Sequence, residues 1–136
     1  MRFMFIVKGN ADSEAGRMPE ESMFAAMADY HEALAKAGAL VDASGLQPTS
    51  KGARIKYSGG KQTVIDGPFT ESKEIVAGYT IIQTNSREEA MDWARRFPAP
   101  MPGGEGEIEI RQLYELDDFE PSPAIERFRK MEDART

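Results

Sequence analysis

Apolar residues recur along this chain with the two spacings that are typical of strands and of amphipathic helices. Residues 3–7 are apolar on both alternating faces, which predicts a strand buried in the middle of a sheet. Between Pro19 and about Ala37 the apolar positions are three and four residues apart, and Gly38 follows as a natural stop. A first helix is therefore expected here. Its apolar stripe comprises Met23, Phe24, Met27, Tyr30 and Leu34.

The remaining pattern predicts further strands and a second helix. Residues 58–60, with the sequence SGG, are a turn signal between two strand-like runs and predict a hairpin. Ser86 and Glu89 form a capping box that starts the second helix, which ends before Pro98. Strands are expected at residues 39–46, 53–57, 61–65, 75–83 and 107–114, and a loop at residues 9–17. The last strand carries a charged row that we interpret as a solvated face, comprising Glu107, Glu109 and Arg111.

The order of these elements is typical of a ferredoxin-like, split βαβ arrangement in the α+β class. Two strand–helix–strand units with a hairpin added would form an antiparallel sheet with both helices on one face. The opposite face then needs a cover, because a large exposed apolar surface is unfavourable in water. A second copy of the chain is the simplest cover. We therefore predict a homodimer whose subunits pack sheet against sheet.

The chain changes character near its end. We therefore divide it into a domain at residues 1–118 and a C-terminal extension at residues 119–136. Pro121 and Pro123 interrupt the extension, and a short helix is expected after them. Its apolar side comprises Ile125, Phe128 and Met131. A helix this short is marginal alone, so it is expected to pack on its own sheet or on a partner subunit.

Composition narrows the classes of function. The 136 residues carry a net charge of −6 without a basic cluster, which argues against nucleic-acid binding. There are no cysteines and one histidine, which excludes thiolate metal sites and multi-histidine metal sites. The first apolar run is too short for a signal peptide, and no run reaches the roughly 20 residues of a membrane span. We expect a cytoplasmic protein without a metal, a cofactor or a membrane partner.

The one histidine, His31, falls on the apolar stripe of the first predicted helix. Its ring is therefore expected to face the interior or a cavity and not open water. Two interpretations remain open. His31 is either a core histidine satisfied by a backbone carbonyl, or an imidazole at the floor of a pocket that takes or gives a proton.

A rigid turn follows the predicted hairpin at residues 66–71, with the sequence DGPFTE. Gly67 tolerates backbone angles that other residues avoid, whereas Pro68 fixes its own φ and has no amide donor. Such a turn can hold Asp66 and Phe69 in fixed directions. It is interpreted either as a structural turn closed by the Asp66 side chain or as the lining of a pocket.

Residues 66–74, DGPFTESKE, followed by Gly78-Tyr79, resemble the signature of the DGPF group of YCII-related proteins. The resemblance extends over most of the chain and fades after about Asp118. It implies a dimeric ferredoxin-like α+β barrel. It also implies that a histidine of the first helix pairs with the aspartate of the turn for acid–base work on a small molecule. The matching positions here are His31 and Asp66.

Two classes of function are compatible with these residues. In the first, His31 and Asp66 are catalytic: the carboxylate fixes the ring tautomer, and the other ring nitrogen moves a proton of a small organic acid. Isomerase or lyase chemistry is expected here, because no serine or cysteine nucleophile pattern is present. In the second, the chain is a non-catalytic small-molecule-binding or regulatory dimer, as the resemblance to sigma-factor-associated relatives implies. The pair is then a structural hydrogen bond.

The substrate of the first class is expected to touch the turn. Gly67, Pro68 and Phe69 would line the pocket. Lys73 would either meet an anionic group of the substrate or pair with Glu71 or Glu74 at the surface. The identity of that small molecule does not follow from these residues.

Overall fold

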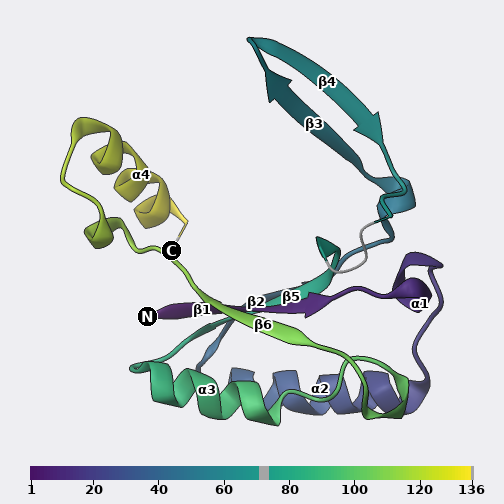
Figure 1. Cartoon of the computed structure of the whole chain (residues 1–136). Helices are drawn as coiled ribbons and strands as arrows, with labels where there is room; N and C mark the ends of the chain where they lie inside the picture. The colour runs from purple at the N-terminus through teal and green to yellow at the C-terminus, as the bar shows by residue number, and fades with distance from the viewer. Residues whose placement is uncertain (71–73, 136) are drawn as a thin grey trace.

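The computed structural model describes residues 1–70 and 74–135 and has an α+β fold (Figure 1). Its main sheet is antiparallel, with the strand order β2-β5-β1-β6. These strands are β1 Arg2–Lys8, β2 Leu40–Gly45, β5 Val76–Gln83 and β6 Ile108–Gln112. Strands joined through a helix are separated in the sheet by another strand. The predicted ferredoxin-like split βαβ order is therefore confirmed.

Two helices, α2 Glu21–Lys36 and α3 Arg87–Arg96, cover one face of this sheet, as predicted (Figure 1). The predicted capping residue Ser86 accepts a hydrogen bond from the Glu89 amide at 3.1 Å. The Glu89 carboxylate accepts one from the Asn85 amide at 3.1 Å. The first bond occupies a donor that the first turn of α3 would otherwise leave without a partner, and the second occupies the amide just before the N-cap residue.

The core lies between the sheet and these helices. Buried and half-buried residues alternate along the first part of β1, because successive side chains of a strand point to opposite faces. Phe3 and Phe5 of β1, Leu34 of α2 and Ile82 of β5 are all 0% exposed on the covered face. Neither helix covers the other side, which we call the open face. Its side chains include Met4, Ile6, Lys8, Asp42, Tyr79, Ile81, Glu109 and Arg111.

The predicted hairpin forms a sheet of its own. Its strands are β3 Ala53–Ser58 and β4 Lys61–Asp66, which pair with each other and not with the main sheet. The hairpin stands away from the open face, at the end of the main sheet where β1 finishes (Figure 1). Nearly all of its residues are exposed.

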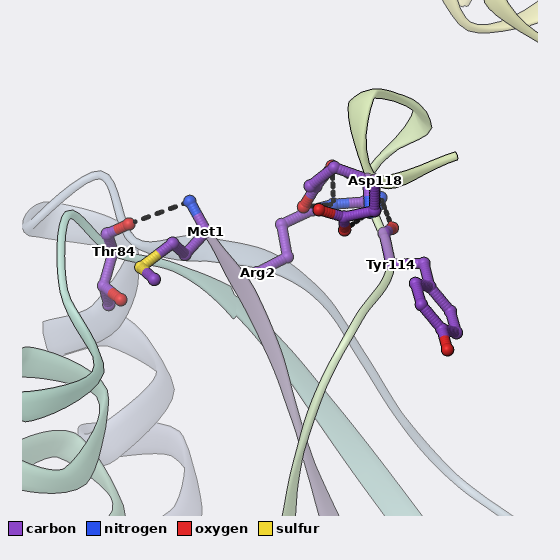
Figure 2. A network of polar contacts seen from close by, with 6 residues as sticks. Met1, Arg2, Thr84, Tyr114 and Asp118 are labelled. Carbon is purple, nitrogen blue, oxygen red and sulfur yellow. Dashed lines mark hydrogen bonds and ion pairs between the residues drawn. The ribbon is translucent and has the colours of Figure 1, made fainter. Parts of the chain in front are cut away.

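The C-terminal helix, α4 Pro123–Ala134, stands on the same side of the sheet at the end where β1 begins (Figure 1). Figure 2 shows contacts that fix the chain before this helix. Arg2 donates three hydrogen bonds to the Glu115 carboxylate, from Nε at 3.0 and 3.3 Å and from Nη2 at 3.1 Å, and one to the Tyr114 carbonyl at 3.3 Å. The Asp118 carboxylate accepts from the Glu115 amide at 2.7 Å. An arginine that binds both oxygens of a carboxylate fixes the orientation of that side chain as well as its position.

Two local expectations are wrong. Residues 9–17, expected to form a loop, contain the one-turn helix α1 Ala11–Glu14, because Asn10 and Ser13 satisfy each other in a reciprocal capping box. Phe24, expected on the buried stripe of α2, is 50% exposed. The fully buried positions of α2 lie in its second half.

Short 3-10 turns connect several elements. They are η1 Thr49–Lys51, η3 Pro102–Gly104 and η4 Leu116–Asp118. Within the two described ranges, no helix has the length and apolar character that a bilayer crossing requires.

Candidate functional site

His31 lies on α2 with its ring between this helix and the sheet. Its Nδ1 atom is 2.7 Å from the carbonyl oxygen of Met27, and its Nε2 atom is 2.9 Å from Oγ1 of Thr80. A carbonyl oxygen can only accept, so Nδ1 carries the proton of the neutral ring and Nε2 accepts from the Thr80 hydroxyl. The rings of Tyr30 and Phe97 pack edge-on against the imidazole. Both ring nitrogens are therefore bonded within the chain, and one of them to a backbone carbonyl.

The neighbours of His31 limit access to its ring. His31 is half-buried, whereas Thr80 is only 2% exposed. The hydroxyl of Tyr30 donates to the Trp93 carbonyl at 2.7 Å, and burial raises the pKa of this tyrosine. A molecule that reaches Nε2 must displace the buried Thr80 hydroxyl. The geometry thus favours a structural role for the Nε2–Thr80 bond.

Asp66 and His31 belong to elements on opposite sides of the sheet, β4 and α2 (Figure 1). Asp66 is the last residue of β4, opposite Ala53, and its side chain is exposed. The hairpin stands on the open side, whereas α2 covers the other face (Figure 1). The described structure contains no hydrogen bond between His31 and Asp66, since both ring nitrogens have other partners. One copy of the chain therefore does not form the expected pair, and the catalytic roles of both residues stay predictions.

The turn after Asp66 is fixed by contacts with the segment around η1. The Gly67 amide donates to the Gly52 carbonyl at 3.0 Å, and the Phe69 amide donates to Oγ1 of Thr49 at 3.0 Å. Thr49 is held in turn by the Glu14 carboxylate, which accepts from its amide at 3.0 Å and from its hydroxyl. The turn is therefore rigid because two other segments of the chain hold it.

Only glycine fits at position 67, for a steric reason. A Cβ atom added to Gly67 would collide with the carbonyl oxygen of Thr49, which is backbone and cannot move independently. The next residue, Pro68, follows a cis peptide bond and is exposed. Both residues shape the turn, and their predicted contact with a substrate stays a prediction.

Phe69 and Lys73 complete the set of predicted site residues. The half-buried Phe69 ring lies under the guanidinium of Arg54, whose central carbon is 3.9 Å from the ring centre. This cation–π contact occupies one face of the ring. Lys73, expected to meet an anionic group, lies outside the described residues.

A second group of polar side chains lies on the open face and was not identified as a site from the sequence. Tyr79 donates to the Asp42 carboxylate at 3.0 Å, and this hydrogen bond raises the pKa of Tyr79. Glu109 lies 3.1 Å from Lys8 and 3.2 Å from Arg111, which lower the pKa of its carboxyl. The alternation of charges along β6 was the signal. This row, interpreted from the sequence as a solvated face, lies on the face of the sheet that neither α2 nor α3 covers.

A groove of about 510 Å³ lies where β1 ends and β6 begins. Lys8 belongs both to the groove and to the ion pairs of the open face. Among the residues that the structure describes, no cluster of His, Cys, Asp or Glu side chains is placed to hold a metal ion. The groove is lined by Lys8, Gly9, Asn10, Ala11, Met101, Glu105, Gly106 and Glu107.

Comparisons relate the chain to known proteins. An uncharacterised protein of Rhizobium meliloti (strain 1021) is 38% identical over 78 residues, which are 57% of this chain and 62% of that protein. The match therefore spans less than two thirds of the length of that relative. A 5-chloro-2-hydroxyhydroquinone dehydrochlorinase from Burkholderia phenoliruptrix, solved in complex with 2,5-dihydroxybenzoquinone, is 15% identical, with a TM-score of 0.46. That superposition covers 84% of this chain and 94% of the other. A likeness of this size says nothing of a shared substrate.

The sequence profile of the YCII-related domain family matches residues 1–117. This range includes all strands of the main sheet, the helices α2 and α3 and the hairpin. The DGPF turn lies inside it as well. The chain therefore belongs to the YCII-related domain family.

Proposed function

We propose that two copies of this YCII-related chain pair through their open faces and bind a small organic acid between them. The observation that supports this proposal is the mixed character of the open face. Met4, Ile6 and Ile81 give it an apolar centre, and they are half-buried although no helix lies over them. A surface of this kind, bordered by polar groups, is typical of interfaces and ligand sites.

One cluster of charged side chains on this face suits an anion. Lys8 and Arg111 both contact the single carboxylate of Glu109, so this cluster has one positive charge in excess. The other carboxylate of the face, Asp42, is bonded to Tyr79. Arginine binds carboxylates through a planar pair of N–H donors, and lysine contributes a point charge. Between two subunits these charges would lie in a medium of lower dielectric constant, where they act more strongly. The preferred ligand is thus a small molecule with a carboxylate and an apolar body.

Sedimentation velocity and calorimetry test this proposal together. We expect a dimer at micromolar concentration, and binding of at least one member of a panel of small aliphatic and aromatic carboxylates. Arg111→Gln should weaken that binding by about tenfold, which corresponds to the loss of one charged hydrogen bond. Arg95→Gln, which removes an arginine paired with Asp92 on α3, is the matched control and should leave binding unchanged. A monomer, or equal binding by both variants, contradicts the proposal.

A second candidate function is the acid–base chemistry predicted for His31 and Asp66. The supporting observation is the tautomer: Met27 holds the Nδ1 proton, which leaves Nε2 as the basic nitrogen. For this function Nε2 exchanges Thr80 for substrate, and the turn that carries Asp66 has to move to the ring, because the two residues are not bonded in one copy of the chain.

The second candidate predicts a specific pattern of activity. His31→Gln should abolish turnover of the bound acid, and Asp66→Asn should lower kcat while the dimer persists. The double variant should lose no more than His31→Gln alone, because the two residues would act as a unit. Retained turnover in His31→Gln would leave the non-catalytic binding dimer as the function.

A further inference from the structure

The hairpin, which we call the arm (residues 53–66), has an apolar side without a cover. Ile55 and Val64 are partners across its two strands, and Tyr57 lies on the same side two residues along. These side chains are 52%, 65% and 71% exposed. A two-stranded hairpin is marginally stable in water when nothing packs against it. The apolar side of the arm therefore needs a surface to pack against, and the described residues of one copy leave it exposed.

Helix α4 shows the same deficit. Phe128 and Met131 are 54% and 53% exposed, and they follow Ile125 at the three-residue spacing of one helix side. An ion pair of 3.2 Å between Arg129 and Asp117 ties the helix to η4. This contact fixes α4 without covering its apolar stripe.

The arm and the segment that leads into α4 carry opposite charge. The arm contains three basic residues and one acidic residue, and residues 115–122 contain four acidic residues and no basic one. Helix α4 itself has three residues of each sign. Attraction between such segments favours contact of the arm with the C-terminal region and disfavours contact of arm with arm. The charges thus distinguish between two ways of pairing the copies.

The positions of the arm and α4 on the sheet connect each way of pairing the copies with a different twofold axis. The arm and α4 stand on the open side of the sheet, at opposite ends of its strands (Figure 1). Two copies packed with their open faces together are related by a twofold axis in the plane between the sheets. An axis that runs across the strands exchanges their ends and brings each arm to the α4 of the other copy. An axis along the strands brings arm to arm and α4 to α4.

We infer that each arm docks on α4 of a second copy of this chain, with the apolar side of the arm against the stripe that holds Phe128 and Met131. The inference rests on the proposed dimer and adds its geometry. Each subunit then closes the interface at both ends of the other, since there are two arms and two C-terminal helices. The arm and α4 are the specificity elements of the dimer.

The chain has no cysteine, so introduced cysteines report single positions. Copies with Tyr57→Cys and copies with Phe128→Cys, carrying different tags, are co-expressed and treated with a short bismaleimide. The expected product is a linked pair with one copy of each kind. The control replaces Tyr57→Cys by Thr63→Cys, which lies on the other side of the same hairpin opposite Lys56 and should link far less. Links between two Tyr57→Cys copies overturn the inference.

A dissociation constant measured by sedimentation gives a second readout, which does not depend on the geometry of a linker. Tyr57→Ala should weaken the dimer by at least about tenfold, as expected when a central interface aromatic is removed, and Thr63→Ala by less than about twofold. A dimer equally tight in both variants overturns the docking of the arm but leaves the proposed dimer standing. A wild-type chain that sediments as a monomer overturns both.

Discussion

The two faces of the main sheet share the same strands but differ in how their side chains are satisfied. On the covered face, Phe5 and Ile82 are fully buried, and the polar Thr80 is bonded to His31. On the open face, Ile6 lies among ion pairs and is only half-buried. Polar groups of the covered face are already occupied inside the chain, whereas those of the open face can still exchange a partner or gain one.

This difference decides where a functional site is expected. The imidazole of His31 has the chemistry of an acid–base group, but its two bonds and its buried neighbour reduce it to a core residue in one copy of the chain. Lys8 and Glu109 are half-buried like His31, and Arg111 is exposed, but all three lie on a face that neither α2 nor α3 covers. The cover over the face, and not the residue type, separates the two clusters.

The largest expected effect tests the covered face. Phe5→Ala removes a fully buried ring that packs edge-on against Phe97, and should lower the free energy of unfolding by about 3–5 kcal/mol. The neighbour Ile6→Ala, on the open face, should cost about 1 kcal/mol in dilute protein, since part of its surface is already exposed. Urea unfolding measures both. If the loss for Ile6→Ala grows with protein concentration, a second copy covers the open face.

The next effect concerns the turn that carries the hairpin on the open side. Gly67→Ala forces a Cβ atom into the Thr49 carbonyl and should cost about 2 kcal/mol, the usual size of overpacking against backbone. Gly45→Ala is the control, because an added Cβ there meets no atom within 4 Å. Thermal unfolding of both variants checks this. Equal melting temperatures would show that η1 does not fix the turn.

The main sheet could be predicted from the sequence because its strands and helices obey simple periods. The apolar run at residues 3–7 became β1, and the capping residue Ser86 starts α3 as expected. The short helix α1 could not be predicted, because it depends on one pair of local hydrogen bonds between Asn10 and Ser13 and not on a periodic pattern.

The site was predictable only in part. The spacing of apolar residues three and four positions apart predicted that His31 faces the sheet. This spacing does not predict which atoms contact the ring nitrogens. The hydrogen bond between Thr80 and His31 depends on the register between β1 and β5, which are distant in sequence, and on the position of α2. Sequence spacing likewise does not say on which side of the sheet a hairpin will stand, and this placed Asp66 away from the ring.

A smaller effect tests the hydrogen bond between Thr80 and His31 on the covered face. Thr80→Val preserves shape and removes the hydroxyl that donates to Nε2 of His31, so this nitrogen loses its partner in a half-buried place. The expected loss in the free energy of unfolding is about 1–2 kcal/mol. Thr63→Val, on the exposed hairpin, should change it little. If Thr80→Val leaves the free energy of unfolding unchanged, water or a ligand replaces the hydroxyl and the His31 ring is accessible.

The smallest effect is a pH dependence on the open face. Lys8 first, and Arg111 with it, hold the pKa of Glu109 below its ordinary value near 4.5. The stabilisation by these ion pairs is therefore present above that pH and is lost as the pH falls through the lower folded value. Glu109→Gln removes this contribution. The difference in urea midpoint between wild type and variant should thus be largest at neutral pH and shrink in acid.

In a single copy of the chain this difference is small, because solvent and salt screen ion pairs that water reaches. Under a second copy, the same ion pairs would lie away from solvent, and the difference should become larger and less sensitive to salt. Measuring the difference at low and at high protein concentration, across the range in which the proposed dimer would form, separates these cases. Glu88→Gln on the outer helix α3 is the control. A difference that is strongly screened by salt at both concentrations means that the charged row of β6 faces water, as its alternation alone suggests, and that the ligand site lies elsewhere.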